Sequence, residues 1–273
     1  MPDQNRRRKM ERTSEKRMRV LSVINLKGGV AKTISTLAIA HILAEHYGFK
    51  VLLVDNDKQG DSSRGLRRRS EEGAGIAEIM TERKPDVHRL IQHTDFGNLD
   101  IITANMRLLK ANLEVMLDQT RPQQTRLKKA LDTVSDKYDF CVIDNAPDIN
   151  ISTINALVAS DDVLVPLEID DNTTEGLEEL VEQIETTKEC LNQGLNLQGC
   201  FITKYDKQNA AHQQGAELLI MSGKYPMFQT KIRASKKVSE STFARMPIPV
   251  YSKYSAAAKD YYQLVCEYLD KIR

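Results

Sequence analysis

The sequence of 273 residues contains no tryptophan, and aromatic residues make up only 5% of it. Its core must therefore be built from aliphatic side chains, which is possible because 41% of the residues are hydrophobic. No run of about 18 or more apolar residues occurs, so the sequence predicts no membrane-spanning helix. The basic N-terminus is followed by no apolar segment, and it therefore lacks the pattern of a secretory signal.

Cysteine is also scarce, and the four cysteines are widely separated: Cys141, Cys190, Cys200 and Cys266. Their spacing lacks the short pairs that are typical of metal sites and disulfide frameworks. We therefore expect reduced, mostly buried thiols in a cytosolic protein.

Charge is abundant and almost balanced, with 39 Lys and Arg against 38 Asp and Glu. The positive excess lies at the N-terminus, where residues 1–19 hold eight basic and three acidic residues. Because such a segment cannot bury enough apolar surface to fold alone, we expect residues 1–18 to form a disordered tail and residues 19–273 a single domain. The tail is either a solvated leader without function or an electrostatic arm for DNA, since neutralising phosphates releases counterions.

Apolar runs of strand length alternate with amphipathic segments of helix length along the rest of the chain. Strands are predicted over residues 20–24, 50–55, 99–103, 140–144, 162–167 and 197–203. Helices are predicted over residues 32–46, 75–92, 105–118, 122–136, 151–159, 174–192, 209–222 and 256–272. The order is typical of an α/β fold with a doubly wound, mostly parallel sheet flanked by helices. The polar segment 56–75 carries a basic triplet, Arg67 to Arg69.

The first predicted strand leads into a glycine-bearing loop that ends in Lys32 and Thr33 and opens a helix. Such a loop binds phosphates, because its backbone N–H groups point at the anion. Lys32 is expected to reach the β- and γ-phosphates, and the Thr33 hydroxyl to bind Mg²⁺. The standard pattern has glycine at the positions of Leu26 and Ala31, and here a second lysine, Lys27, stands at the head of the loop.

Two further strands end in carboxylates at the sheet edge where open α/β folds bind ligands. Asp55 and Asp57 follow the second strand, with Gln59 close behind. In isolation they would be read as acids of a polar turn, but beside a phosphate-binding loop they become candidates for the reaction. Asp144 closes an apolar strand, and such a carboxylate holds Mg²⁺, often through water.

Read as Lys-Gly-Gly-x-x-Lys-Thr, residues 27–33 resemble the deviant Walker A loop of the ParA/MinD superfamily of P-loop ATPases. Segments 55–60, 148–162 and 201–206 are similar to later motifs of that family, and the resemblance extends over roughly residues 19–270. It implies ATP and Mg²⁺ as cofactors, with Thr33, Asp57 and Asp144 at the metal. The nucleotide-binding residues that it implies are Lys27, Gly28, Gly29, Val30, Ala31, Lys32, Thr33, Ile34 and Arg233. Asn145 and Ala146 depart from the usual Asp-Thr-Pro-Pro of the family.

In catalysis, the resemblance implies that Lys32 and Asp55 act on the bound ATP, with Asp55 orienting the attacking water. It implies that Lys27 reaches the nucleotide of a facing subunit, so that two ATP molecules lie between two protomers. The protein would then be a slow, partner-stimulated, Mg²⁺-dependent ATP hydrolase.

As a biological function, the resemblance implies plasmid partition or chromosome segregation. An ATP-bound homodimer would bind double-stranded DNA non-specifically, and a ParB-like centromere-binding protein would stimulate hydrolysis and release. The implied location is cytoplasmic and nucleoid-associated, with no membrane partner. The implied DNA-binding residues are Lys231, Arg233, Lys236 and Lys237, although such a cluster is also typical of a solvated face.

Two alternatives use the same loop. A MinD-like membrane-cycling ATPase needs a C-terminal amphipathic helix with a basic face, whereas residues 261–273 mix acids among their polar positions. An electron-transfer ATPase that resembles the nitrogenase iron protein needs cysteines that hold a cluster between subunits, and the cysteines here follow no such pattern.

Overall fold

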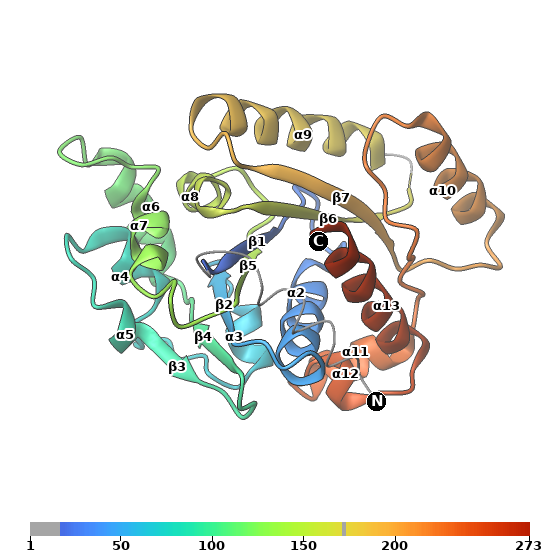
Figure 1. Cartoon of the computed structure of the whole chain (residues 1–273), viewed down its shortest axis with the longest axis horizontal. Coiled ribbons are helices and arrows are strands. Elements are labelled where there is room, and N and C mark those ends of the chain that lie inside the picture. The colour runs from blue at the N-terminus through green and yellow to red at the C-terminus, as the bar shows by residue number, and fades with distance from the viewer. Residues whose placement is uncertain (1–16, 171–172) are drawn as a thin grey trace.

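The computed structural model describes residues 17–170 and 173–273 (Figure 1). Within these ranges the strands are β1 (Arg19–Val23), β2 (Val51–Asn56), β3 (Ile91–His93), β4 (Leu99–Ile102), β5 (Phe140–Asn145), β6 (Asp162–Glu168) and β7 (Asn196–Thr203). The helices are α2 (Lys32–His41), α3 (Asp61–Gly65), α4 (Ile76–Thr81), α5 (Val87–Leu90), α6 (Arg107–Leu117), α7 (Arg126–Asp132), α8 (Ile151–Ala159), α9 (Thr173–Cys190), α10 (Ala210–Ser222), α11 (Lys236–Phe243), α12 (Ile248–Tyr251) and α13 (Ala256–Lys271), with a π-helical turn η1 (Ile42–His46) after α2.

The strands form one sheet in the order β3-β4-β2-β5-β1-β6-β7. Every neighbouring pair is parallel except β3 and β4. The predicted doubly wound, mostly parallel α/β fold is therefore confirmed.

The predicted helical segment 75–92 is wrong at its end, because Ile91 begins the edge strand β3 and pairs with Ile102 of β4. A three-residue strand is too short to show an alternating pattern in the sequence.

Alternate residues of the central strands face opposite layers of helices. On β2, Val51 and Leu53 belong to the core that α2 and α13 cover, whereas Leu52 and Val54 belong to the core beneath α4, α6, α7 and α8. Figure 1 shows the helices distributed on both sides of the sheet. Burial on both faces explains the continuously apolar strands of the sequence.

The helix after the phosphate-binding loop is held by the C-terminal helix. Tyr261 of α13 is buried, and its hydroxyl lies 2.9 Å from the Ser35 hydroxyl of α2. Gly48, with φ of 73°, ends the segment that α2 and η1 form, as predicted. Among the described residues, no helix is long and apolar enough to cross a membrane.

The N-terminal tail that was predicted over residues 1–18 lies outside the described residues except for its last two. Met18 is only 2% exposed and belongs to the core below β2. Arg17 lies 4.0 Å from the carboxylate of Asp161. The packed part of the chain therefore begins no later than Met18.

Candidate nucleotide-binding site

The loop between β1 and α2 has backbone conformations that are typical of a phosphate-binding loop. Gly29 and Ala31 both have positive φ, of 79° and 65°. Glycine tolerates this left-handed conformation, whereas alanine adopts it with strain. Ala31 is also the N-cap of α2, so the loop turns directly into the helix N-terminus. The missing glycine of the standard motif is thus replaced by an alanine in the conformation that glycine would adopt.

Lys32 is buried at the first position of α2 and turns back toward the loop. Its Nζ donates to the backbone oxygen of Lys27 at 2.7 Å. Burial lowers the pKa of Lys32, and the charges of Asp144 and Asp57 partly offset this effect. A partly desolvated ammonium at the N-terminus of a helix is suited to bind an incoming phosphate.

Asp144 occupies the centre of the site, on the middle strand of three. It lies in register with Val23 of β1 and with Asp55 of β2. The Ser62 hydroxyl donates to its carboxylate at 2.7 Å and the Thr36 hydroxyl at 3.3 Å. Burial raises the pKa of Asp144, and hydrogen bonds from side chains, Ser62 first, partly offset the rise.

Asp55 is fully buried beside Asp144 and accepts hydrogen bonds from the start of α3. The backbone N–H and the hydroxyl of Ser63 donate to Oδ2 at 2.7 and 2.6 Å. The N–H of Asp57 lies 3.3 Å from Oδ1. Burial and then the neighbouring charge of Asp144 raise the pKa of Asp55. Short hydrogen bonds hold the carboxylate in one orientation, as positioning of a water molecule requires.

The residues that were predicted to hold Mg²⁺ fit that ion by their chemistry. Thr33, Asp57 and Asp144 supply hydroxyl and carboxylate oxygens. The described residues contain no cluster of three or more His, Cys, Asp or Glu side chains that could hold a metal alone. Mg²⁺ does not need such a cluster, because it commonly uses one or two protein oxygens together with substrate phosphates and water.

Lys27 has a different environment from Lys32. Its N–H donates to the Asn25 side chain at 2.9 Å, which fixes the head of the loop. Its ammonium forms an ion pair with Asp170, just after β6, and about a third of its side chain is exposed. The second lysine of the motif is thus at the surface of the site, while Lys32 lies inside it.

The departure from the family pattern at Asn145 is explained by a partner on the next strand. Asn56 and Asn145 lie in register, and the Asn56 side-chain nitrogen donates to the Asn145 side-chain oxygen at 2.9 Å. Both residues are buried, and Asn145 also donates toward the Val23 carbonyl at 3.2 Å. The two amides thus connect the neighbouring strands one residue beyond the two carboxylates.

Ser62 and Ser63 contact the predicted carboxylates but are not among the site residues predicted from the sequence. The available signal was the polar run after Gly60, whose φ of 65° starts helix α3. A five-residue helix has no readable periodicity, so the contacts of its serines depend on the tertiary structure.

The four predicted DNA-binding residues lie on the segment that enters α11. Arg233 forms a two-pronged ion pair with Asp260 of α13, with a shortest distance of 2.6 Å. Lys231 lies over the Tyr205 ring at 5.5 Å, and Lys237 pairs with a glutamate one turn later at 2.6 Å. Lys236 is exposed at the first position of α11. The structure therefore gathers these cations at one place, and the Arg233 guanidinium is held by a carboxylate of the same chain.

Comparison with known proteins agrees with this geometry. A family model described as an AAA domain matches residues 18–197. The chromosome partitioning protein ParA of Caulobacter vibrioides is 32% identical over 259 residues, which cover 94% of this chain and 96% of that protein. The sporulation initiation inhibitor protein Soj of Bacillus subtilis is 32% identical over 250 residues, which cover 91% of this chain and 97% of Soj.

Solved structures show the same fold. The crystal structure of cobyrinic acid a,c-diamide synthase from Mycobacterium smegmatis, with bound ATP analogue and magnesium, superimposes with a TM-score of 0.77 at 26% identity. The match covers 91% of this chain and 93% of the synthase. One fold thus serves both partition proteins and a synthase, so the function has to be argued from the site.

Proposed function

We propose that this chain, which belongs to the ParA family of P-loop ATPases, is a DNA-partitioning ATPase that hydrolyses ATP in a sandwich dimer. The ATP-bound dimer binds double-stranded DNA non-specifically, and a ParB-like partner stimulates hydrolysis and release. The observation that supports this proposal most directly is the pair of lysines, one inside the phosphate-binding loop and one at its surface.

Within one subunit, Lys32 and the loop N–H groups bind the phosphates, while Thr33, Asp57 and Asp144 would hold Mg²⁺. The bound Mg²⁺ would neutralise charge on the β- and γ-phosphates. Asp55 orients the attacking water, and the two hydrogen bonds from Ser63 keep its carboxylate in place. Phosphoryl transfer needs positioning and charge neutralisation more than covalent chemistry, and these residues are suited to both.

Between subunits, Lys27 supplies a second cation. Its ammonium lies beside Asp170 with about a third of the side chain exposed, as a cation that acts on the nucleotide of a facing protomer requires. A cation provided across an interface can accelerate phosphoryl transfer by about 10³- to 10⁵-fold. Hydrolysis would then depend on dimer formation, so the lifetime of the ATP-bound dimer would set how long the protein stays on DNA.

The direct test measures DNA binding by the purified protein with ATP and with ADP at the same salt concentration. We expect retention on duplex DNA with ATP only, and expect Asp55→Ala to remain bound to DNA with ATP because it does not hydrolyse the nucleotide. Lys32→Ala should not be retained with either nucleotide. Equal DNA binding with ATP and ADP would refute the proposal.

The alternative function, a MinD-like membrane-cycling ATPase, has less support from the structure. The apolar side chains of the C-terminal helix α13 are buried against the rest of the chain, including Tyr261, Leu264, Val265 and Tyr268. A helix that binds a membrane surface must present its apolar face to lipid. Flotation with anionic lipid vesicles tests this alternative, and we expect no ATP-dependent flotation.

A further inference from the structure

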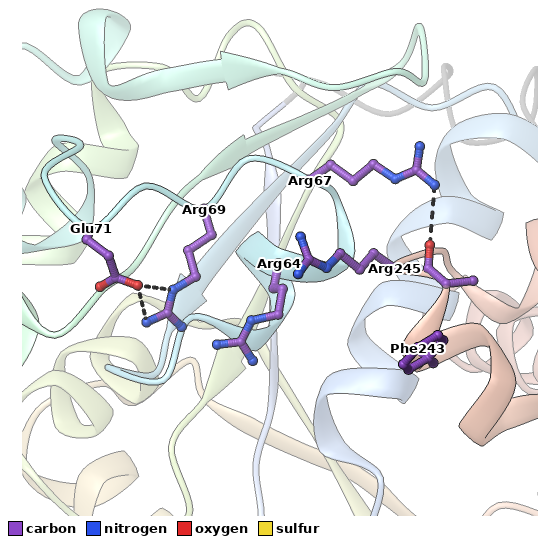
Figure 2. A pocket seen from close by; sticks show the side chains of 7 residues that line it. Arg64, Arg67, Arg69, Glu71, Phe243 and Arg245 are labelled. Carbon is purple, nitrogen blue, oxygen red and sulfur yellow. Dashed lines mark hydrogen bonds and ion pairs between the residues drawn. The ribbon is translucent and has the colours of Figure 1, made fainter.

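Helix α3 and the end of α11 border an open groove of about 520 Å³ (Figure 2). Five of its seven lining residues are charged: the lining consists of Arg64, Arg67, Arg69, Glu71, Phe243, Ala244 and Arg245. The groove therefore carries four guanidinium groups and one carboxylate. That carboxylate, of Glu71, pairs with Arg69, and Arg64 pairs with Asp61 of α3, which is not part of the lining. An anion of several charges is the ligand class that such a lining favours, because arginine binds phosphate and carboxylate groups in two-pronged fashion.

Two of these arginines have an unfavourable backbone conformation. Arg67 and Arg245 have φ of 57° and 54°, and each stands two residues after the last residue of a short helix, α3 and α11. Glycine or asparagine is typical at that position. A side-chain N–H of Arg67 donates to the Ala244 carbonyl at 3.3 Å and so links the two sides of the groove. Backbone strain of this kind is found more often at functional sites than elsewhere.

Arg69 lines the groove with its guanidinium held by Glu71. Its Nε and Nη2 contact the Glu71 carboxylate at 2.9 and 2.8 Å (Figure 2). Its Nη1 is buried and has no hydrogen-bond partner within the described part of the chain. By contrast, Arg68 of the same triplet pairs with Asp95 at 2.7 Å and does not line the groove.

We propose that this groove binds the backbone phosphates of duplex DNA. The inference rests on the proposed function and names a DNA-contacting surface in addition to the predicted residues of the α11 entry. An acidic peptide would find the same guanidinium groups, since clusters of arginine also bind acidic motifs. Duplex DNA is favoured because the proposed function supplies it and because the groove offers no enclosed pocket for an apolar anchor. The only large apolar side chain of the groove is Phe243, which is 92% exposed and forms no enclosed pocket.

Helix α11 connects the two basic surfaces. Lys236 and Lys237 open this eight-residue helix, and Phe243 closes it at the groove. The helix rises roughly 12 Å over eight residues. Phosphates of one DNA strand follow each other at about 3.4 Å along the duplex axis. A single strand that runs beside α11 would thus meet the lysines at one end and the groove arginines at the other.

The test compares a groove variant with a variant of equal charge change. The groove variant combines Arg64→Ala with Arg245→Asn, because asparagine tolerates positive φ. The control combines Lys110→Ala on α6 with Lys188→Ala on α9, two lysines that do not line the groove. The affinity of each ATP-bound protein for a fluorescent duplex is measured by anisotropy from about 50 to about 200 mM KCl.

We expect the groove variant to bind DNA more weakly and the slope of log affinity against log salt to fall by about two, one for each lost phosphate contact. The control should keep the wild-type slope, and Arg64→Lys with Arg245→Lys should largely restore it. Unchanged binding of a fluorescent ATP analogue would show that the variants are folded.

The proposal would be wrong if the wild-type protein bound DNA and the groove variant kept its slope. In that case the partition function would stand, and the lysines of α11 would be tested next by the same titration. Absence of ATP-dependent DNA binding by the wild type would overturn both proposals. Binding of a fluorescent poly-glutamate peptide that the groove variant loses, with DNA binding unchanged, would assign the groove to an acidic partner instead.

Discussion

Asp55 and Asp144 lie opposite each other on neighbouring parallel strands, and two consecutive residues of one short helix hold them. Ser63 donates to Asp55 and Ser62 to Asp144. Helix α3 therefore connects the candidate water-orienting carboxylate with the candidate metal-binding carboxylate. The same helix carries Arg64 at the edge of the arginine groove. A movement of α3 would shift the serine hydrogen bonds to both carboxylates and, at the same time, the position of Arg64 in the groove.

The two lysines of the loop should have separable effects. Lys32→Ala removes the buried ammonium and should weaken ATP binding roughly ten- to hundredfold, as expected for a lost charged hydrogen bond. Lys27→Ala should leave ATP binding by the monomer close to wild type but reduce hydrolysis by about 10³-fold or more. Titration with a fluorescent ATP analogue and a phosphate-release assay measure the two quantities. Equal loss of ATP binding in both variants would contradict a role for Lys27 across the interface.

The buried carboxylate pair should make the stability of the nucleotide-free protein depend on pH. The pKa of each group is raised in the folded state, so the folded protein binds more protons than the unfolded chain. Their contribution is present below the ordinary Asp pKa of about 3.9 and is lost as pH rises toward the raised values. We expect the free energy of unfolding to fall as pH rises from about 4 toward about 8, between the ordinary Asp pKa and the raised values.

The control for this prediction is Asp55→Asn, which keeps the shape of the side chain and removes one titrating group. Its unfolding free energy, measured with urea, should depend less on pH over the same range. A pH dependence identical to that of the wild type would show that other groups cause the change.

Ser63→Ala should affect both stability and activity. The substitution removes the 2.6 Å hydrogen bond to Asp55 and leaves the Ala104 N–H, now 3.0 Å from the Ser63 hydroxyl, without its acceptor. We expect a loss of about 1–3 kcal/mol, the cost of unpaired buried groups. ATPase activity should fall as well, because the orientation of Asp55 is relaxed. Ser239→Ala, at an exposed position of α11, is the matched control and should change neither quantity.

The buried Asn56–Asn145 pair should show a measurable coupling energy. Asn56→Ala and Asn145→Ala each leave the partner side chain with an unpaired group, whereas the double variant removes both. The double variant should therefore be more stable than the sum of the single effects predicts, by about 1 kcal/mol. Urea unfolding of the four proteins gives the coupling. Strict additivity would show that the 2.9 Å contact contributes nothing.

Much of the fold could be predicted because the apolar runs of the strands and the amphipathic patterns of the helices are long. The strands near residues 20, 51, 99, 140, 162 and 196 are confirmed within one or two residues of their predicted starts. Short elements escaped prediction: β3 has three residues, α3 five and α12 four. Their conformations depend on pairing and packing with distant segments, which leave no periodic signal.

By itself, the sequence determined the phosphate-binding loop, the two strand-end carboxylates and the family, because these are local patterns with a fixed order along the chain. Only the tertiary structure decided that Ser62 and Ser63 hold the carboxylates and that Arg233 pairs with Asp260. The tertiary structure also brought the arginines after α3 to the end of α11, across a separation in sequence of more than 170 residues. Contacts of this kind arise from the packing of segments that no local pattern connects.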